Sequence, residues 1–228
     1  MPNRLLDTMT TLVAGRHMLK HPFYQAWNDG ALTRDMLKFY ACQYYHFVNN
    51  FPRMVSAVHS NTPDIAVRGP ILRNLMDEEL GSENHPALWM RFANAMGASE
   101  QDVREAEPLP TTIALVDTMM GYCRKGSFQE GLGSLYAYES QIPEVSRVKM
   151  EGLRKFYGLT NPDAIEFFLV HEEADVLHSR EEAELIVTTT PAGTEPSVER
   201  AVEGTAMALW GFLDGVHEKS VAAGLGVC

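Results

Sequence analysis

The chain has 228 residues, of which 45% are apolar and 21% charged, and this balance excludes intrinsic disorder as its main state. Such a length can bury the core of one compact domain, and we expect that domain to span residues 1–228. Asp and Glu number 30 against 19 Lys and Arg, so the net charge is −11. This acidic balance argues against nucleic acid and anionic membranes as partners.

Proline, glycine and capping residues predict a succession of helices. In chain order, we expect helices from Thr33 past Phe51 with a kink at Pro52, from Thr62-Pro63-Asp64 to about Leu80, from Pro86 to Gly97, from Ser127 to Glu139, from Pro143 to Tyr157, from Asn161-Pro162-Asp163 through many turns, and from Pro196 through Leu213. The segment between Ala98 and Pro110 is rich in charge and proline, which predicts an exposed loop. No stretch alternates between polar and apolar residues as a strand would, so we expect an all-α protein of about seven or eight helices.

Cysteine usage and the first residues indicate the compartment. Cys42, Cys123 and Cys228 are odd in number and far apart, which predicts neither a disulfide framework nor a structural zinc site. The first twenty residues contain Asp7 and no continuous apolar stretch, unlike a secretory signal. The apolar window that starts at Ile113 is too short to span a bilayer. We therefore expect a cytoplasmic protein with no membrane partner.

Three potential metal ligands follow one another in the segment VHEEADVLHSR, namely His171, Asp175 and His178. On a helix, these offsets correspond to directions of about 0°, 40° and −20°, so the three side chains leave one face. Phe167 and Phe168 share that side of the helix. A polar stripe that faces a core has to be satisfied, and a metal ion is one way to satisfy it. The alternative is a solvent-exposed face with two accidental histidines.

Two further segments carry candidate ligands. Glu78 and His85 occur in LMDEELGSENHPALW, where a glycine and a proline make one continuous helix doubtful. Glu79 and Glu83 are alternatives for the acidic ligand, and a charged helix end is the other interpretation of this segment. Glu139 lies among aromatic and apolar residues in SLYAYESQIP. An acid buried there would be paired, protonated or a ligand, whereas an exposed helix face would leave it solvated.

Together these segments offer three carboxylates and three imidazoles. Such a donor set is similar to that of the carboxylate-bridged di-metal centres inside helical bundles. Oxygen and imidazole donors without a thiolate favour iron or manganese over zinc or an iron–sulfur cluster. In their reduced form, such centres activate O2.

The order and spacing of these residues resemble those of the haem-oxygenase-like di-metal oxidases. The six matching positions are Glu78-x6-His85, Glu139 within YESQIPEV, and His171-x3-Asp175-x2-His178. Within that fold family, the chain is most similar to the branch that contains a chlamydial death-domain-associating protein, over nearly its whole length. The resemblance implies a seven-helix bundle and a dinuclear iron or mixed iron–manganese centre held by the six residues. It also implies O2 and a reductant as co-substrates, an external electron donor, and a possible homodimer.

The same resemblance implies a reaction. The branch is associated with para-aminobenzoate formation for folate synthesis by self-sacrifice, in which a tyrosine supplies the ring and a lysine the nitrogen. Tyr24 in KHPFYQAW and Lys149 in VSRVKMEGL match these roles, and Tyr40 and Tyr138 match tyrosines near the family's site. On their own, these residues would indicate only core aromatics and a solvated charge. A nitrogen donor requires that desolvation lower the pKa of Lys149, so that a neutral amine exists.

Other members of the fold family remain as alternatives. Thiaminase-type members use a cysteine nucleophile, and neither Cys42 nor Cys123 matches its context. The cofactorless oxidase of pyrroloquinoline quinone assembly lacks the full ligand set. Haem oxygenases bind haem through an N-terminal histidine, for which His17 and His21 are candidates, although the ligand set argues against haem. Di-metal oxidases of fatty acids or amino acids share the site, and a death-domain-type interaction module is an alternative of another class.

Overall fold

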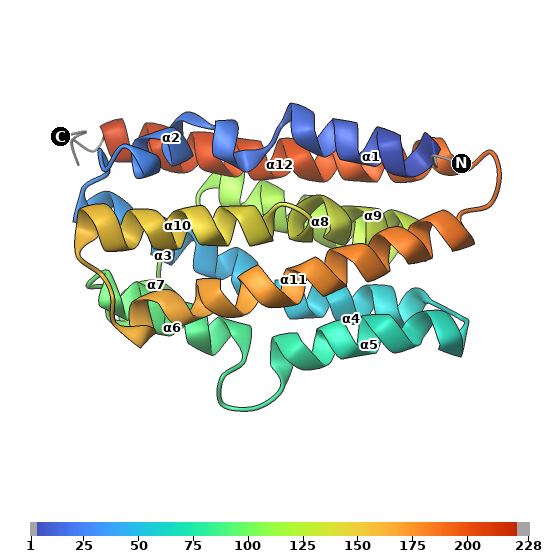
Figure 1. Cartoon of the computed structure of the whole chain (residues 1–228), viewed down its shortest axis with the longest axis horizontal. Coiled ribbons are helices and arrows are strands. Elements are labelled where there is room, and N and C mark those ends of the chain that lie inside the picture. The colour runs from blue at the N-terminus through green and yellow to red at the C-terminus, as the bar shows by residue number, and fades with distance from the viewer. Residues whose placement is uncertain (1–3, 223–228) are drawn as a thin grey trace.

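The structure is a computed structural model that describes residues 4–222, and these residues form an all-helical bundle, as predicted. The elements are α1 (Arg4–Gly15), the 3-10 turn η1 (Met18–Lys20), α2 (Pro22–Asn28), α3 (Arg34–Val48), α4 (Phe51–Asn61), α5 (Ile65–Glu79), α6 (His85–Ala95), α7 (Glu100–Arg104), α8 (Pro110–Lys125), α9 (Phe128–Glu139), α10 (Ile142–Tyr157), α11 (Pro162–Thr189) and α12 (Glu195–Ala222). The longer helices run along the long axis of the molecule (Figure 1).

The described chain contains more helices than the seven or eight expected. The helix expected to pass Phe51 ends at Val48, and α4 begins with a proline in its first turn, where the missing amide is tolerated. The segment between Ala98 and Pro110 is not a continuous loop, because Ser99 and Asp102 form a capping box that starts α7. The helices α1, α2 and α8 are also additional to the predicted ones.

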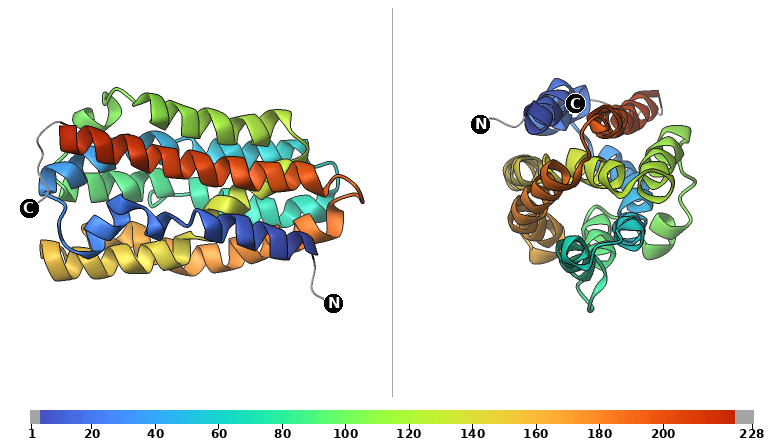
Figure 2. Two further views of the ribbon diagram at one scale, coloured as in Figure 1. Left: turned by 90° about the horizontal axis from the view of Figure 1, so that it is seen from above. Right: turned by 90° about the vertical axis from the view of Figure 1, so that its right-hand side faces the viewer.

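Two helices of 28 residues, α11 and α12, organise the bundle. Helix α12 packs against α8 and α9, whereas α11 packs against α6, α9 and α10. The end-on view in Figure 2 shows the helices grouped around a common interior. Aromatic side chains fill much of that interior, and the largest fully buried ones include Trp27, Trp89, Tyr24, Tyr40 and Phe168.

Helix α5 lies at the periphery and contributes mainly polar groups to the interior. It packs chiefly on α4 and also contacts α6 and α11. Its buried residues are Ile71, Asn74 and Glu78. Two of these three side chains are polar, so α5 contributes an amide and a carboxyl group to the interior.

The cysteines and the apolar content of the helices can also be compared with the sequence. Cys42 and Cys123 are free and buried, while Cys228 lies outside the described residues. Among the helices of residues 4–222, none is both long enough and apolar enough to cross a bilayer.

Candidate metal centre

The six predicted ligands lie in the interior in two groups. Glu78, His85 and His171 form the first group, and within it the potential ligand atoms lie within 4.8 Å of one another. The second group meets the same limit and consists of Glu139, Asp175 and His178. All six side chains are buried, so the expected convergence is observed. Two such groups fit a dinuclear site, and the binding of metal by these residues stays a prediction.

Helix α11 supplies three of the six predicted ligands, because the buried residues along its length are apolar at both ends and polar in the middle. Phe167 and Phe168 pack in the core at one end, and Ile186 is buried at the other. Between them lie the buried polar side chains of His171, Asp175, His178 and Glu182. These positions recur at helical spacing, so all of them lie on one face of α11. The helix can be this long because it contains no Gly or Pro after its first turn.

A turn between α5 and α6 brings Glu78 to His85. Gly81 has φ +79°, a left-handed conformation that glycine adopts without steric cost, and it directs the chain back towards α11. Asn84 then caps α6 by accepting a hydrogen bond from the amide of Ala87. The next residue is His85, whose Nδ1 lies 2.8 Å from Oε1 of Glu78. The pair therefore converges through a loop rather than through a continuous helix.

Hydrogen bonds to the histidines fix which ring nitrogens face the site. Nδ1 of His171 donates to the carbonyl of Phe167 at 2.6 Å, which leaves Nε2 free for a ligand. Nε2 of His178 lies 3.1 Å from the carboxylate of Asp77. The opposite nitrogen of His178, Nδ1, faces Asp175 at 3.5 Å and Glu139 at 3.9 Å. Outer hydrogen bonds of this kind orient metal-binding imidazoles.

Buried polar atoms without hydrogen-bond partners favour a cation at this place. Such atoms are present on Glu139 (Oε2) and Asp175 (Oδ2). Burial raises the pKa of Asp175 to about 8, and the charges of Glu139 and Glu78 add to this. Carboxyl groups crowded into a dry interior avoid ionisation unless a positive charge compensates them. The donor set therefore fits divalent metal ions with a preference for oxygen and nitrogen.

Glu182 is a site residue that the sequence did not single out. Its side chain is 4% exposed, and its carboxyl lies near that of Glu139. Glu139 also accepts a hydrogen bond of 2.9 Å from the amide of Asn74. The spacing of seven residues from Asp175 repeats that between His171 and His178, and this repeat could have identified Glu182.

Lys149 lies inside the bundle, contrary to what its charged neighbours in the sequence suggest. It is 3% exposed, and its Nζ donates a 2.7 Å hydrogen bond to the phenol oxygen of Tyr40. Six aromatic rings surround Nζ with centroids at 5.1–5.9 Å. Desolvation holds the pKa of Lys149 well below its usual value, so the neutral amine is favoured.

Two pairs of tyrosines lie in contact beside Lys149. The phenol oxygens of Tyr24 and Tyr40 are 3.3 Å apart, and Tyr44 donates a 2.8 Å hydrogen bond to Tyr138. The rings of Tyr40 and Tyr44 stack with centroids 5.4 Å apart, which joins the pairs. Burial raises the pKa of Tyr138 well above its usual value, and the charge of Asp175, a member of the second candidate ligand group, raises it further.

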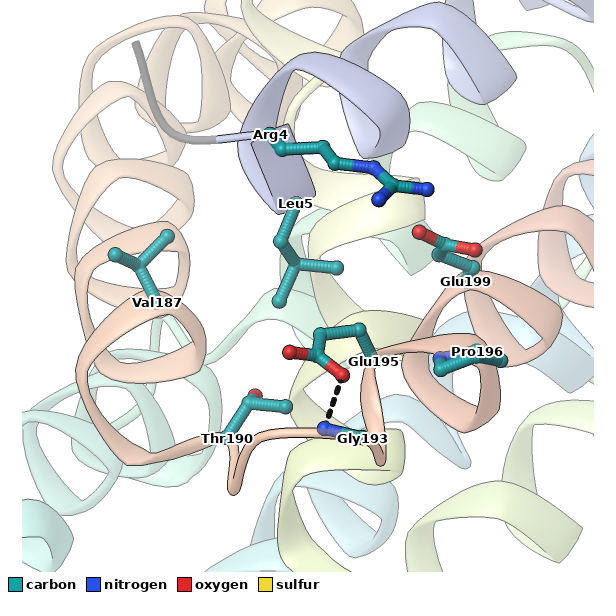
Figure 3. A pocket seen from close by; sticks show the side chains of 8 residues that line it. All are labelled: Arg4, Leu5, Val187, Thr190, Gly193, Glu195, Pro196 and Glu199. Atoms are coloured by element: carbon teal, nitrogen blue, oxygen red, sulfur yellow. Dashed lines mark hydrogen bonds between the residues drawn. The ribbon is translucent and has the colours of Figure 1, made fainter. Parts of the chain in front are cut away.

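Cavities near the candidate site are small, and the larger grooves are open to solvent. A cavity of about 10 Å³ touches Asn74, His178 and Glu182. A groove of about 410 Å³ on the surface reaches His85 and His178 from outside. The groove in Figure 3, of about 470 Å³, lies where α11 leads into α12 and touches none of the six predicted ligands.

Structure also bears on the thiol and haem alternatives. Burial raises the pKa of the Cys42 thiol and raises that of Cys123 to about 12, so neither is a ready thiolate. His21 is buried, and its Nδ1 accepts from the amide of Phe23 while its Nε2 lies 2.9 Å from Asp214. Both ring nitrogens of His21 are thus engaged in holding α2.

Comparisons with known proteins agree with this architecture. The model of the TENA/THI-4/PQQC family matches residues 6–216. A protein of Nitrosomonas europaea named 4-aminobenzoate synthase is 44% identical, with 96% of this chain and 94% of that protein covered. One of Chlamydia muridarum with the same name is 41% identical over 93% and 90% of the two chains. A Shewanella denitrificans domain with a heme oxygenase-like fold superposes with a TM-score of 0.79 at 20% identity, covering 96% and 92%. The predicted haem-oxygenase-like fold is therefore confirmed.

Proposed function

The chain belongs to the TENA/THI-4/PQQC family, and we propose that it forms 4-aminobenzoate from its own side chains at a dinuclear metal centre. The names of the relatives from N. europaea and C. muridarum support this product. The observation that carries the proposal is the buried contact of Lys149 with Tyr40, whose phenol oxygen lies beside that of Tyr24. A nitrogen source and an aromatic ring are thereby held together in the interior that contains the candidate ligands.

The carbon skeleton of 4-aminobenzoate corresponds to a tyrosine side chain. Its ring and carboxyl carbon match the ring and Cβ of Tyr24, and its amine stands where tyrosine has the phenol oxygen. Forming the product therefore requires that the Cα–Cβ bond break, that Cβ be oxidised to a carboxylate, and that nitrogen replace the phenol oxygen. Lys149 would lose Nζ in the same process: its amine condenses with the oxidised ring to an imine, the phenol oxygen leaves as water, and isomerisation followed by hydrolysis breaks the Cε–Nζ bond and leaves an aldehyde at Cε. O2 is the oxidant, and an external donor supplies the electrons that its activation needs.

The residues around this pair prepare it for the reaction. A neutral amine at Lys149 has a lone pair, and desolvation favours that form. The surrounding rings keep water away from the amine. When bound by the six residues of the two groups, a reduced iron or iron–manganese centre would supply O2 activation. Tyr44 and Tyr138 form a path of contacts from this centre to Tyr40.

The small enclosed space beside His178 and Glu182 also supports self-sacrifice over oxidation of a fatty acid or amino acid. The cavity next to His178 and Glu182 holds about 10 Å³, which is room for about one water molecule. The larger groove of about 410 Å³ that touches His85 and His178 lies open to solvent and does not enclose a substrate. Because each chain contains one Tyr24 and one Lys149, it would yield at most one product.

Purified protein supplied with Fe(II), Mn(II), a reductant and O2 tests the proposal. We expect 4-aminobenzoate at no more than one equivalent per chain, and peptides that show altered masses at Tyr24 and Lys149. Tyr24→Phe and Lys149→Arg should abolish the product. The matched controls are Tyr45→Phe on α3 and Lys155→Arg on α10, and both should form it like wild type. Product at full yield from either of the first two variants would contradict the self-sacrifice assignment.

A further inference from the structure

We propose that Glu182 is a fourth carboxylate of the metal centre and binds the ion held by Glu139, Asp175 and His178. This inference rests on the proposed metal centre and adds a residue to it. Glu182 lies on α11, four residues after His178 and seven after Asp175, so it continues the buried ligand stripe by one helical turn.

The surroundings of Glu182 provide no partner for its charge. The side chain is 4% exposed, and both of its carboxylate oxygens lack a hydrogen-bond donor. The polar group it meets is the carboxyl of Glu139, which is itself fully buried. Two carboxylates side by side in a dry interior repel each other, and a cation is the usual means by which proteins hold them together.

An independent observation is the small cavity in front of Glu182. Its volume is about 10 Å³, and its polar lining comes from Asn74, His178, Glu181 and Glu182. The apolar lining comes from Ile71, Leu132 and neighbouring side chains. Of the second group, His178 lines this space together with Glu182, and its size is room for about one water molecule between the two side chains.

Charge balance gives a further reason. Two divalent ions bring four positive charges, and the carboxylates of the two groups supply three negative ones. The three histidines bind metal as neutral imidazoles. One positive charge would then remain in the interior, where an uncompensated charge is costly. Ionised Glu182 would make the centre neutral.

Metal titration of the full chain tests this proposal without reference to product formation. We would remove metal with a chelator, titrate Mn(II) under argon, and compare wild type, Glu182→Gln and Glu184→Gln. Glu184 is exposed on the same helix, so its substitution removes the same charge outside the site. We expect Glu182→Gln to weaken the second Mn(II) equivalent by about tenfold to a hundredfold and to leave the first unchanged, while Glu184→Gln binds both like wild type.

Folding of the variant is checked by the melting temperature of the metal-free protein. We expect Glu182→Gln to melt no lower than wild type, because the substitution removes a carboxylate–carboxylate repulsion. Unchanged binding of both Mn(II) equivalents by Glu182→Gln would overturn the inference. A loss of both equivalents together with a lower melting temperature would also overturn it, since Glu182 would then be a structural residue. Absence of Mn(II) binding by wild type would instead contradict the proposed metal centre itself.

Discussion

The amine of Lys149 lies 2.7 Å from the phenol oxygen of Tyr40, in an interior from which water is excluded. Desolvation destabilises the positive charge of a lysine in this position, and its hydrogen-bond partner is a neutral phenol whose pKa burial raises well above the usual value. Such a lysine costs folding free energy and yields a neutral amine. The fold thus retains a destabilising residue at the place where the proposed reaction needs nitrogen.

Lys149→Met should stabilise the protein at neutral pH. The pKa of Lys149 is lowered on folding, so the unfolded chain binds a proton that the folded chain does not. Wild-type stability therefore rises with pH up to the pKa of the unfolded lysine, by about 1.4 kcal/mol for each pH unit between the two pKa values. Methionine removes this dependence. Urea unfolding should show Lys149→Met as the more stable chain at pH 7, by a margin that shrinks towards pH 10.

The control for this prediction is Lys155→Met, at an exposed position of α10. Its stability should remain within about 0.5 kcal/mol of wild type at every pH. A margin for Lys149→Met that is constant over the pH range would show that Lys149 titrates normally in the folded protein.

Gly152→Ala should destabilise the protein and lower the product yield. A Cβ at position 152 would lie 2.7 Å from Cδ1 and Nε1 of Trp27, whose ring is fully buried. The indole would have to move, and its 3.3 Å hydrogen bond to the carbonyl of Lys149 would be strained. We expect a loss of about 1–3 kcal/mol in unfolding free energy. Gly121→Ala is the matched control, since its Cβ meets nothing within 4 Å, and it should stabilise α8 by about 0.5–1 kcal/mol.

Tyr44→Phe should weaken both the core and the reaction. Tyr44 donates a 2.8 Å hydrogen bond to Tyr138, and the substitution leaves a buried hydroxyl without that partner. We expect a loss of about 1–3 kcal/mol in unfolding free energy and slower formation of product. Tyr45→Phe changes a neighbouring residue that bonds to Arg104 near the surface, and it should leave the rate of product formation unchanged. Equal rates for Tyr44→Phe and Tyr45→Phe would exclude Tyr44 from the proposed path.

Metal should stabilise the fold. An ion that binds only the native state raises the free energy of unfolding by about 2.7 kcal/mol at a concentration a hundred times its Kd. In a chain of this size, that increase corresponds to a rise of roughly 5–10 °C in Tm. Calorimetry with Mn(II) should show this increase for wild type. His171→Ala removes a proposed ligand, whose Nδ1 is engaged by the carbonyl of Phe167, and should lose most of the increase. His59→Ala, on α4 and outside both groups, should retain it. An unchanged increase in His171→Ala would argue against its role as a ligand.

Much of the candidate site could be predicted from the sequence because helical spacing determines which side chains share a face. His171, Asp175 and His178 required only the periodicity of one long helix. Glu78 and His85 could not be joined by periodicity, since their contact depends on a turn at Gly81 with positive φ. Glu182 shares the stripe, and its spacing of seven residues from Asp175 was the signal that could have identified it.

Burial is the property that local sequence reveals least. Lys149 is surrounded in the sequence by charged residues, and only the packing of α10 against α2 and α11 places it among aromatic rings. Tyr44 acquires its role from a contact with Tyr138, which is 94 residues away in the chain. Helix α7, which begins at Glu100, could have been predicted only by recognising the capping box of Ser99 and Asp102 within a polar segment. Tertiary contacts of this kind have no local signature.

The central claim is that the product is built from the chain itself, and isotope transfer tests it most directly. Protein would be produced with ring-¹³C tyrosine and Nζ-¹⁵N lysine, freed of small molecules, and supplied with unlabelled Fe(II), Mn(II), reductant and O2. We predict 4-aminobenzoate that carries both the ¹³C ring and the ¹⁵N amine, in at most one equivalent per chain. Unlabelled 4-aminobenzoate, or product formed over many turnovers, would contradict the account.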